Sequence, residues 1–386
     1  MILPSLNPSF NVQGFLKEHW GKTPVFLPKL ISIEDLISPE ELAGLACEEF
    51  VESRLVTNYG QRSFSHGPFS EEQFLRLPAK EWTLLVQSVD LFIDEIKALK
   101  SLFQFLPSWL LDDVMVSYAV SGGGVGPHFD HYDVFLIQGE GSRRWRVGEK
   151  CDSNTAVDTS SGLNLLQETK LAEEFILEKG DVLYVPPHFA HWGEAITNST
   201  CYSIGFRGPS QSEMVDGLGG VISSKLSPFD RFINKPVQHV SDNPAKISNE
   251  NLFSAFQITQ SRLGNYEEFC RWFGAYMTTS RNPDFFVESD VARTFSEIRL
   301  SLDEGASITF NPVSRRAYCE LVGSDWILFF VDGEAYKLPR DNIPLISELC
   351  STSVCLKSII NQINDQNLEA MMITLVKKDS VQIRED

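Results

Sequence analysis

The chain has 386 residues, of which 42% are hydrophobic and 22% charged, the proportions of an ordinary globular protein with a sizeable core. The formal net charge of -19 disfavours nucleic acid and anionic membranes as direct partners and fits a basic one, because long-range fields steer opposite charges together. The same charge also fits an acidic cytosolic protein with no such partner. No apolar run approaches the roughly 18 residues of a membrane span, so no membrane is expected.

Seven cysteines are scattered along the chain, in an odd number and without a CxxC pair. This distribution indicates reduced thiols rather than a disulfide framework or a zinc module. The first twenty residues lack the basic start and apolar core of a signal peptide. We therefore expect a cytoplasmic protein.

Residues 10–110 are predicted to contain helices and strands. Ser38 is followed by a proline and by a glutamate at the positions of a helix N-terminus, which predicts a helix from there to about Phe50. Apolar residues recur along Ala79–Phe103 with helical spacing. This pattern predicts a longer helix that covers the outside of a barrel.

Residues 112–208 contain strands separated by turn residues, the pattern of an all-β double-sheet barrel of the jelly-roll or cupin type. Val134–Gln138 and Ser142–Val147, joined by the turn Gly139–Gly141, are predicted to form a hairpin. The glycine-rich loop Ser121–Gly126 lacks the lysine of a phosphate loop and leads into a strand, so nucleotide binding is not expected.

Two histidines and a carboxylate predict a metal site in this barrel. Within a strand, His128 and Asp130 would point to the same face about 6.6 Å apart, and His191 follows a second predicted strand. Two histidines and one carboxylate, with the opposite positions open, form the ligand set of non-haem Fe(II) oxygenases, which must also take up a chelating co-substrate and O2. A His-x-Asp pair is by itself a weak pattern, and the nearby His131 and His188 are expected to be structural.

Arg143 is expected to point into the barrel, because it shares a strand face with the apolar residues Trp145 and Val147. A buried guanidinium needs an anion, and its planar fork matches a carboxylate. One interpretation is that Arg143 holds the far carboxylate of 2-oxoglutarate, whose 2-oxoacid end chelates iron. The other is a salt bridge to an internal aspartate or glutamate. Five further side chains could line the pocket or belong to the core: Met115, Tyr118, Phe129, Tyr132 and Trp192.

The chain resembles the bacterial JmjC-domain ribosomal oxygenases, and most closely those that hydroxylate an arginyl residue of large-subunit ribosomal protein sixteen. The resemblance runs over essentially the whole chain, and its linked blocks are far more specific than His-x-Asp alone. These blocks are SHGPF at 65–69, HFDHYDVFLIQGEGSRRWRVG at 128–148, GDVLYVPPHFAHWGEA at 180–195 and YSIGFRGPS at 202–210.

The resemblance implies a catalytic centre in which His128, Asp130 and His191 bind Fe(II), while Arg143 and Ser117 bind 2-oxoglutarate. The implied reaction uses O2, releases succinate and CO2, and hydroxylates a basic ribosomal protein. Three alternatives stay open. The substrate could be a histidyl residue of another ribosomal protein or an RNA base, the protein could be a cupin-type metal protein without oxygenase activity, or it could be a non-catalytic interaction protein.

The resemblance also implies an α+β fold in three parts. Residues 1–209 would form a JmjC oxygenase domain, with N-terminal helices around a double-stranded β-helix core, residues 210–281 a helical segment for homodimerisation, and residues 282–386 a winged-helix-like domain. The aromatic face of the predicted helix Tyr266–Thr279 would serve the dimer or pack on the chain's own barrel. Acidic residues outnumber basic ones in residues 282–386, so DNA binding is not expected.

Overall fold

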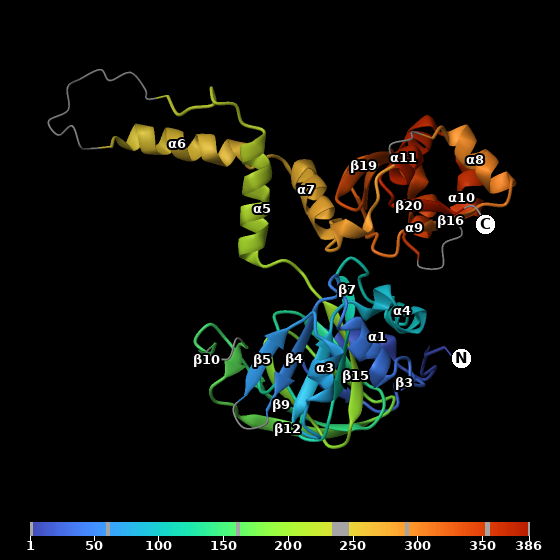
Figure 1. The fold of residues 1–386 in the computed structure, drawn as a ribbon. Coiled ribbons are helices and arrows are strands. Elements are labelled where there is room, and N and C mark those ends of the chain that lie inside the picture. The colour runs from blue at the N-terminus through green and yellow to red at the C-terminus, as the bar shows by residue number, and fades with distance from the viewer. Residues whose placement is uncertain are drawn as a thin grey trace. The chain divides into compact units, whose positions relative to one another are not determined.

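The structure, a computed structural model, describes residues 3–58, 62–159, 163–233, 247–289, 293–351 and 356–384. The chain divides into two compact units, residues 1–208 and 209–386, which Figure 1 draws in blue through green and in green through red. Every strand pair in these described ranges is antiparallel.

Two sheets form the body of the first unit. The larger has the strand order β2-β13-β8-β15-β7-β6-β4-β5, the smaller has the order β12-β9-β14, and β1-β3 and β10-β11 are short pairs. The strands are β1 Ser5–Leu6, β2 Val25–Leu27, β3 Ile31–Ser32, β4 Ser53–Thr57, β5 Ser63–His66, β6 Trp82–Val86, β7 Leu111–Ala119, β8 Asp133–Gln138, β9 Ser142–Lys150, β10 Val157–Asp158, β11 Leu165–Leu166, β12 Leu171–Glu178, β13 Val182–Val185, β14 Phe189–Ala195 and β15 Ser199–Phe206.

The larger sheet has a hydrophobic core on each face. Side chains of both sheets meet in the inner core, among them Leu136 of β8, Leu183 of β13 and Trp145 of β9. The outer core packs the helices α1 (Val12–Glu18), α2 (Pro39–Leu45) and α4 (Asp94–Ser101) on the other face of the same sheet. Two sheets closed over one core form the predicted jelly roll, with the helices of the N-terminal half on its outside.

The hairpin predicted around Gly139–Gly141 is wrong. β8 pairs with β13 and β15, whereas β9 pairs with β12 and β14, so the turn carries the chain from one sheet to the other. The turn bonds instead to Thr200, which accepts from Gly139 N at 2.8 Å and donates to Glu140 O at 3.0 Å. A short glycine turn specifies a reversal of direction, and distant segments decide which strands then pair.

The long helix predicted over Ala79–Phe103 is also wrong. This segment forms β6, a 3₁₀ turn (η1, Val89–Leu91) and the shorter helix α4. β6 lies between β4 and β7 and is buried on both faces, so its apolar residues run continuously and their spacing also matches a helix. The capping box at Ser38 is present as predicted, but its helix ends at Leu45 instead of near Phe50.

The second unit combines helices with two small sheets, β16-β20 and β17-β18-β19. Its α-helices and strands are α5 Gln211–Ser224, α6 Asn249–Arg262, α7 Tyr266–Thr278, α8 Phe295–Asp303, β16 Ser307–Phe310, β17 Arg316–Glu320, β18 Trp326–Val331, β19 Glu334–Pro339, α9 Ile343–Leu349, α10 Leu356–Gln362, α11 Gln366–Lys377 and β20 Val381–Arg384. The short α3 (Glu71–Leu75) belongs to the first unit.

The buried face of α7 packs on β18 of the same unit. A Cβ atom on Gly274 would lie 2.2 Å from the ring of Phe330, so helix and sheet touch closely there. On another side of α7, Trp272 packs against Gly217 of α5. Part of the aromatic face of α7 is therefore used inside the second unit.

Within the described ranges, no helix combines the length and the apolar character needed to cross a bilayer. The six cysteines in these ranges are unpaired thiols, and Cys355 lies outside the described residues.

Candidate metal and co-substrate site

A loop positions His128, where the sequence predicted a strand. This loop exchanges backbone hydrogen bonds with Ala195 of β14 (2.8 and 2.9 Å), and His128 itself exchanges two with His191 (3.1 and 2.8 Å). Regular strand structure begins only at Asp133, after Asp130. The pairing with β14, and not strand periodicity within the His-x-Asp segment, therefore brings the two histidines together.

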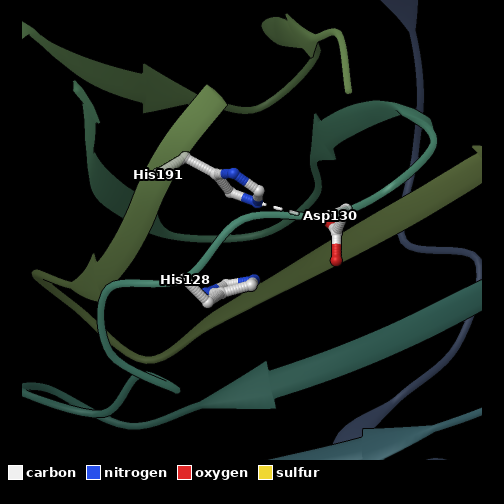
Figure 2. Close-up of side chains that lie close together, drawn as sticks. All are labelled: His128, Asp130 and His191. Carbon is white, nitrogen blue, oxygen red and sulfur yellow. Dashed lines mark ion pairs between the residues drawn. The ribbon is translucent and has the colours of Figure 1, made fainter. Parts of the chain in front are cut away.

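His128, Asp130 and His191 turn their side chains toward one point (Figure 2). One ligand atom from each residue lies within 4.8 Å of the others, and His191 Nε2 is 3.6 Å from Asp130 Oδ2. His131 and His188 lie outside this cluster and contact each other, with 3.1 Å between Nδ1 of His131 and Nε2 of His188. The structure thus separates the predicted ligands from the two histidines expected to be structural.

Backbone carbonyls fix both histidine rings. Nδ1 of His128 lies 2.9 Å from Gly126 O, and Nδ1 of His191 lies 3.0 Å from Phe189 O. A carbonyl oxygen only accepts, so each Nδ1 carries the proton and each Nε2 keeps a lone pair for a metal. Burial, together with the nearby His128, lowers the pKa of His191 to about 4, so this ring is neutral at physiological pH.

Arg143 is buried on the inner face of β9, as predicted, and bonds to two serines. Its Nε donates to Ser199 Oγ (2.9 Å), Nη1 donates to Ser117 Oγ (2.8 Å), and Nη2 donates to the backbone oxygens of both serines (3.0 Å each). Burial lowers the pKa of Arg143 from its ordinary value.

The charge on Arg143 has no counter-ion among the described residues. No carboxylate in the described part of the chain forms an ion pair with it, so the structure does not support the internal salt bridge considered from the sequence. Four of the five N–H groups of a guanidinium are used by the two serines, and one on Nη1 is left for a further acceptor. This arrangement suits the carboxylate of a small ligand.

Sequence reasoning missed Ser199, which binds the guanidinium as closely as Ser117 does. Ser199 opens β15, where it pairs with Ala119 of β7, and it is fully buried. In the sequence it stands in a polar run, Asn198–Thr200, that reads as a turn. Only the long-range pairing of β15 with β7 places it beside Arg143.

Asp113 is a second residue that the sequence did not indicate. Asp113, Met115 and Ser117 alternate along β7, so they share the face that Ser117 presents to Arg143. Tyr132 lies within electrostatic range of both Asp113 and the metal cluster. Burial raises the pKa of its phenol, and the nearby carboxylates of Asp130 and Asp113 raise it further.

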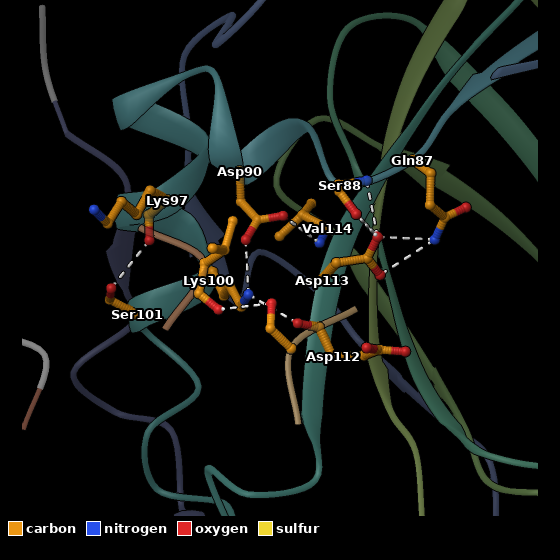
Figure 3. Close-up of polar contacts among 11 residues, drawn as sticks. Gln87, Ser88, Asp90, Lys97, Lys100, Ser101, Asp112, Asp113 and Val114 are labelled. Atoms are coloured by element: carbon orange, nitrogen blue, oxygen red, sulfur yellow. Dashed lines mark hydrogen bonds and ion pairs between the residues drawn. The ribbon is translucent and has the colours of Figure 1, made fainter. Parts of the chain in front are cut away.

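The Asp113 carboxylate is held by neutral donors (Figure 3). Its Oδ2 accepts from Ser88 N (2.8 Å), Ser88 Oγ (2.8 Å) and Gln87 Nε2 (2.9 Å), whereas Oδ1 accepts only one longer bond of 3.2 Å. The neighbouring Asp90 is different, because it pairs with Lys100 Nζ at 2.7 Å. No cation in the described ranges pairs with Asp113, and burial raises its pKa.

The five pocket candidates divide between the inside and the outside of the barrel. Met115 lies on the inner face of β7 beside Ser117, and Tyr132 packs against the inner core. Tyr118 points to the opposite face of β7, with its ring 5.7 Å from that of Trp82, and Trp192 lies under the guanidinium of Arg146 at 6.0 Å. Phe129 packs edge-on against the exposed pair of histidines.

Comparisons with known proteins identify the family of the chain. A model of the JmjC domain matches residues 98–214, and a model of the ROXA-like winged helix matches residues 260–382. The chain is 39% identical over 277 residues to the ribosomal protein uL16 3-hydroxylase of Escherichia coli, which covers 71% of this chain and 73% of that protein. It is 30% identical over 383 residues to a probable ribosomal oxygenase of Haemophilus influenzae, and the match covers 91% of this chain and 94% of that protein.

Solved structures of E. coli YcfD have the same fold. One is 32% identical, with a TM-score of 0.84 over 99% of this chain and 100% of that one. Another, a complex of this ribosomal oxygenase with cobalt and 2-oxoglutarate, gives a TM-score of 0.81 and covers 98% of this chain and 99% of that one. The α+β fold, with its jelly-roll core and C-terminal winged helix, is thereby confirmed, and the chain belongs to the JmjC-domain ribosomal oxygenases, a family of 2-oxoglutarate-dependent hydroxylases.

Proposed function

We propose that the protein is an Fe(II)- and 2-oxoglutarate-dependent oxygenase that hydroxylates an arginyl side chain of ribosomal protein uL16. One observation carries this proposal, the combination in one barrel of the cluster His128, Asp130 and His191 with the unpaired cation of Arg143. The E. coli relative named uL16 3-hydroxylase supports the substrate, and the complex of YcfD with cobalt and 2-oxoglutarate supports the cofactors.

In this proposal each residue of the site has one task. His128, Asp130 and His191 would hold Fe(II) and leave the opposite positions to 2-oxoglutarate and O2. Bound iron supplies the oxidative chemistry, in which one oxygen atom of O2 enters a C–H bond as hydroxyl and the other enters succinate as CO2 leaves. Arg143 and Ser117 would hold the far carboxylate of 2-oxoglutarate, and the apolar inner core excludes water from the reaction.

Asp113 is the proposed partner of the target guanidinium. Its Oδ1 can accept further hydrogen bonds, and a carboxylate without a cation gains more from arginine than from a neutral histidine. The net charge of -19 would also attract a basic ribosomal protein. These features favour an arginyl substrate over the histidyl alternative.

Incubation of the Fe(II)-loaded protein with 2-oxoglutarate, O2 and a uL16 peptide is expected to give succinate and a peptide heavier by one oxygen atom. Mass spectrometry of the peptide and a succinate assay measure the two products. A control peptide with lysine in place of each arginine should stay unmodified. Succinate without peptide oxidation would keep the oxygenase chemistry and reject the substrate, whereas no turnover at all would favour the non-oxygenase metal protein or the non-catalytic alternative.

A homodimer through residues 210–281 is also part of this proposal. The helix α6 exposes Leu252, Phe253, Phe256 and Ile258, with 53, 60, 57 and 41% of each residue accessible. Exposed apolar side chains gathered on one helix fit a second copy of the chain better than water.

Sedimentation of the whole protein is expected to give the mass of two chains. Phe253→Asp combined with Phe256→Asp should shift it to the mass of one chain, because two carboxylates would have to be buried at the interface. Val322→Asp, at a site that is 85% exposed in the second unit, should leave the dimer intact. A wild-type protein that sediments as one chain would reject the dimer.

We place the reaction in the cytoplasm, where a ribosomal protein substrate is made, and we expect no direct binding of DNA by the second unit. The absence of disulfides among the six described cysteines and the acidic balance of residues 282–386 support these two points.

A further inference from the structure

Trp145 carries a buried hydrogen-bond donor that no described residue accepts. Only 6% of Trp145 is exposed, and its Nε1 has no partner. Native proteins rarely leave a buried N–H group unpaired, and a buried tryptophan usually bonds through its indole nitrogen. This donor therefore points to an acceptor that the chain itself does not supply.

The indole lies between the anchor for the far carboxylate and the metal cluster. Arg143 and Trp145 share the inner face of β9, one alternation apart. On β14, Ala195 pairs with Arg143, Gly193 pairs with Trp145, and His191 pairs with the next residue of that row. The ring centroids of Trp145 and His191 are 6.2 Å apart. A ligand that reaches from Arg143 to the metal ligands must pass this indole.

Two glycines make room for the indole at this place. A Cβ atom on Gly193 would lie 2.9 Å from Cε2, Cζ2 and Cη2 of Trp145, so the face of the six-membered ring rests on bare backbone. Behind it, a Cβ atom on Gly124 would lie 2.2 Å from the carbonyl oxygen of Gly193. The ring, the strand and the glycine-rich loop are stacked in close contact, which holds the N–H in a defined position.

We propose that the indole N–H of Trp145 donates a hydrogen bond to the metal-bound end of 2-oxoglutarate, at the carboxylate oxygen that does not coordinate iron. This inference rests on the proposed function and adds a positioning residue to it. Chelation through the 2-oxo group and one carboxylate oxygen would leave the second carboxylate oxygen free to accept a hydrogen bond. A neutral donor there orients the co-substrate and adds no charge beside the metal ligands.

Nuclear magnetic resonance of the tryptophan indole groups tests the contact directly. The protein is labelled with ¹⁵N-tryptophan and loaded with Zn(II), a diamagnetic substitute for Fe(II). Addition of 2-oxoglutarate is expected to move the Trp145 N–H proton signal downfield and to slow its exchange with solvent. The signal is identified by its loss in Trp145→Phe, and the signal of Trp326, which is 43% exposed, should stay in place. Binding of 2-oxoglutarate with no change in the Trp145 signal would overturn the proposal.

Affinity measurements on variants give a second test. Trp145→Phe keeps an aromatic ring and removes the donor, so 2-oxoglutarate should bind the Co(II)-loaded protein about tenfold more weakly, with the affinity for Co(II) unchanged. Gly193→Ala keeps the donor but displaces the ring and should weaken binding in the same direction. Trp326→Phe is the matched control and should bind 2-oxoglutarate as the wild type does.

The outcomes separate this inference from the function on which it rests. Unchanged 2-oxoglutarate affinity in Trp145→Phe would overturn the role of Trp145 and leave the oxygenase proposal standing. A metal-loaded wild type that binds no 2-oxoglutarate would overturn both. Should Trp145→Phe fail to fold, the resonance experiment on the wild-type protein still decides.

Discussion

Replacing Asp130 with alanine is expected to abolish both metal binding and hydroxylation. The substitution removes one of three ligand atoms that lie within 4.8 Å of one another, and with it the carboxylate of the cluster. Affinity for Co(II), as a stable substitute for Fe(II), should fall by more than about 100-fold, because even a residue that only supports a metal ligand contributes about 10- to 100-fold. Titration calorimetry with Co(II) and the succinate assay measure the two losses.

Replacing Arg143 with alanine should separate co-substrate binding from metal binding. The guanidinium donates its hydrogen bonds to Ser117 and Ser199 and to none of the metal ligands, so affinity for Co(II) should stay within about twofold. The KM for 2-oxoglutarate should rise on the order of 100-fold or more, because the ligand carboxylate loses a buried charge-assisted partner. Arg143→Lys keeps the charge but loses the planar fork, so its KM for 2-oxoglutarate should lie between those of the wild type and Arg143→Ala.

Arg144→Ala is the matched control for Arg143. Arg144 is the next residue on β9, points to the outer face and pairs with Glu174 at 3.3 Å. A partly exposed ion pair contributes little, so its loss should leave both the metal affinity and the KM for 2-oxoglutarate unchanged. Equal loss of metal in Asp130→Ala and Arg143→Ala would contradict the division of roles between ligand and anchor.

Arg143 shows where sequence reasoning works best. Its strand β9 runs over nine residues, and side chains along a strand point alternately to its two faces. This alternation correctly placed Arg143, Trp145 and Val147 on the inner face. Ser117 is also in a regular strand, but that strand lies within a sheet that carries a core on each face. Periodicity therefore gave no reason to select it, and only the family resemblance did.

The His-x-Asp segment shows where local patterns fail. The expectation that His128 and Asp130 share a strand face was wrong, yet both side chains reach the same point. What brings His128 to His191 is backbone pairing across more than 60 residues of sequence, between a glycine-rich loop and β14. Local spacing cannot encode such a contact, and the same reason explains the wrong hairpin at Gly139–Gly141.

Ser199 and Asp113 could not be found from the sequence, because their roles depend on what lies opposite them. Ser199 acquires its role when β15 pairs with β7, and Asp113, unlike Asp90, has no lysine partner. A single sequence shows the residue type but not the presence or absence of a counter-ion. Whether a carboxylate has a counter-ion is known only from the folded structure.

Replacing Asp113 with asparagine is expected to impair hydroxylation of the uL16 peptide while leaving 2-oxoglutarate chemistry intact. Asparagine has nearly the same shape but carries no charge, so it cannot form an ion pair with a guanidinium. The KM for the peptide should rise by about 10- to 100-fold, which corresponds to one hydrogen bond to a charged group. The KM for 2-oxoglutarate and the succinate formed without peptide should not change. Peptide titrations with both assays measure this difference.

The same substitution should not destabilise the protein at neutral pH. Burial raises the pKa of Asp113, so in the pH window between the ordinary and the raised pKa the folded state binds more protons than the unfolded state. The free energy of unfolding of the wild type therefore falls as pH rises through this window. Asp113→Asn has no titrating group at this position, so its free energy of unfolding does not fall for this reason. Urea unfolding of both proteins across this window should show that the free energy of unfolding of the variant increases relative to that of the wild type as pH rises.

Asp90→Asn is the control that separates a substrate contact from a structural carboxylate. Asp90 is buried, and it accepts from Lys100 Nζ at 2.7 Å and from Val114 N at 2.8 Å. Its replacement leaves Lys100 without its ion pair and should lower stability by on the order of 2 kcal/mol, with an unchanged KM for the peptide. The two aspartates are thus expected to give opposite results in both measurements. If Asp113→Asn also lost stability and kept its peptide KM, Asp113 would be a structural residue like Asp90, and the selection of arginine would have to come from elsewhere in the pocket.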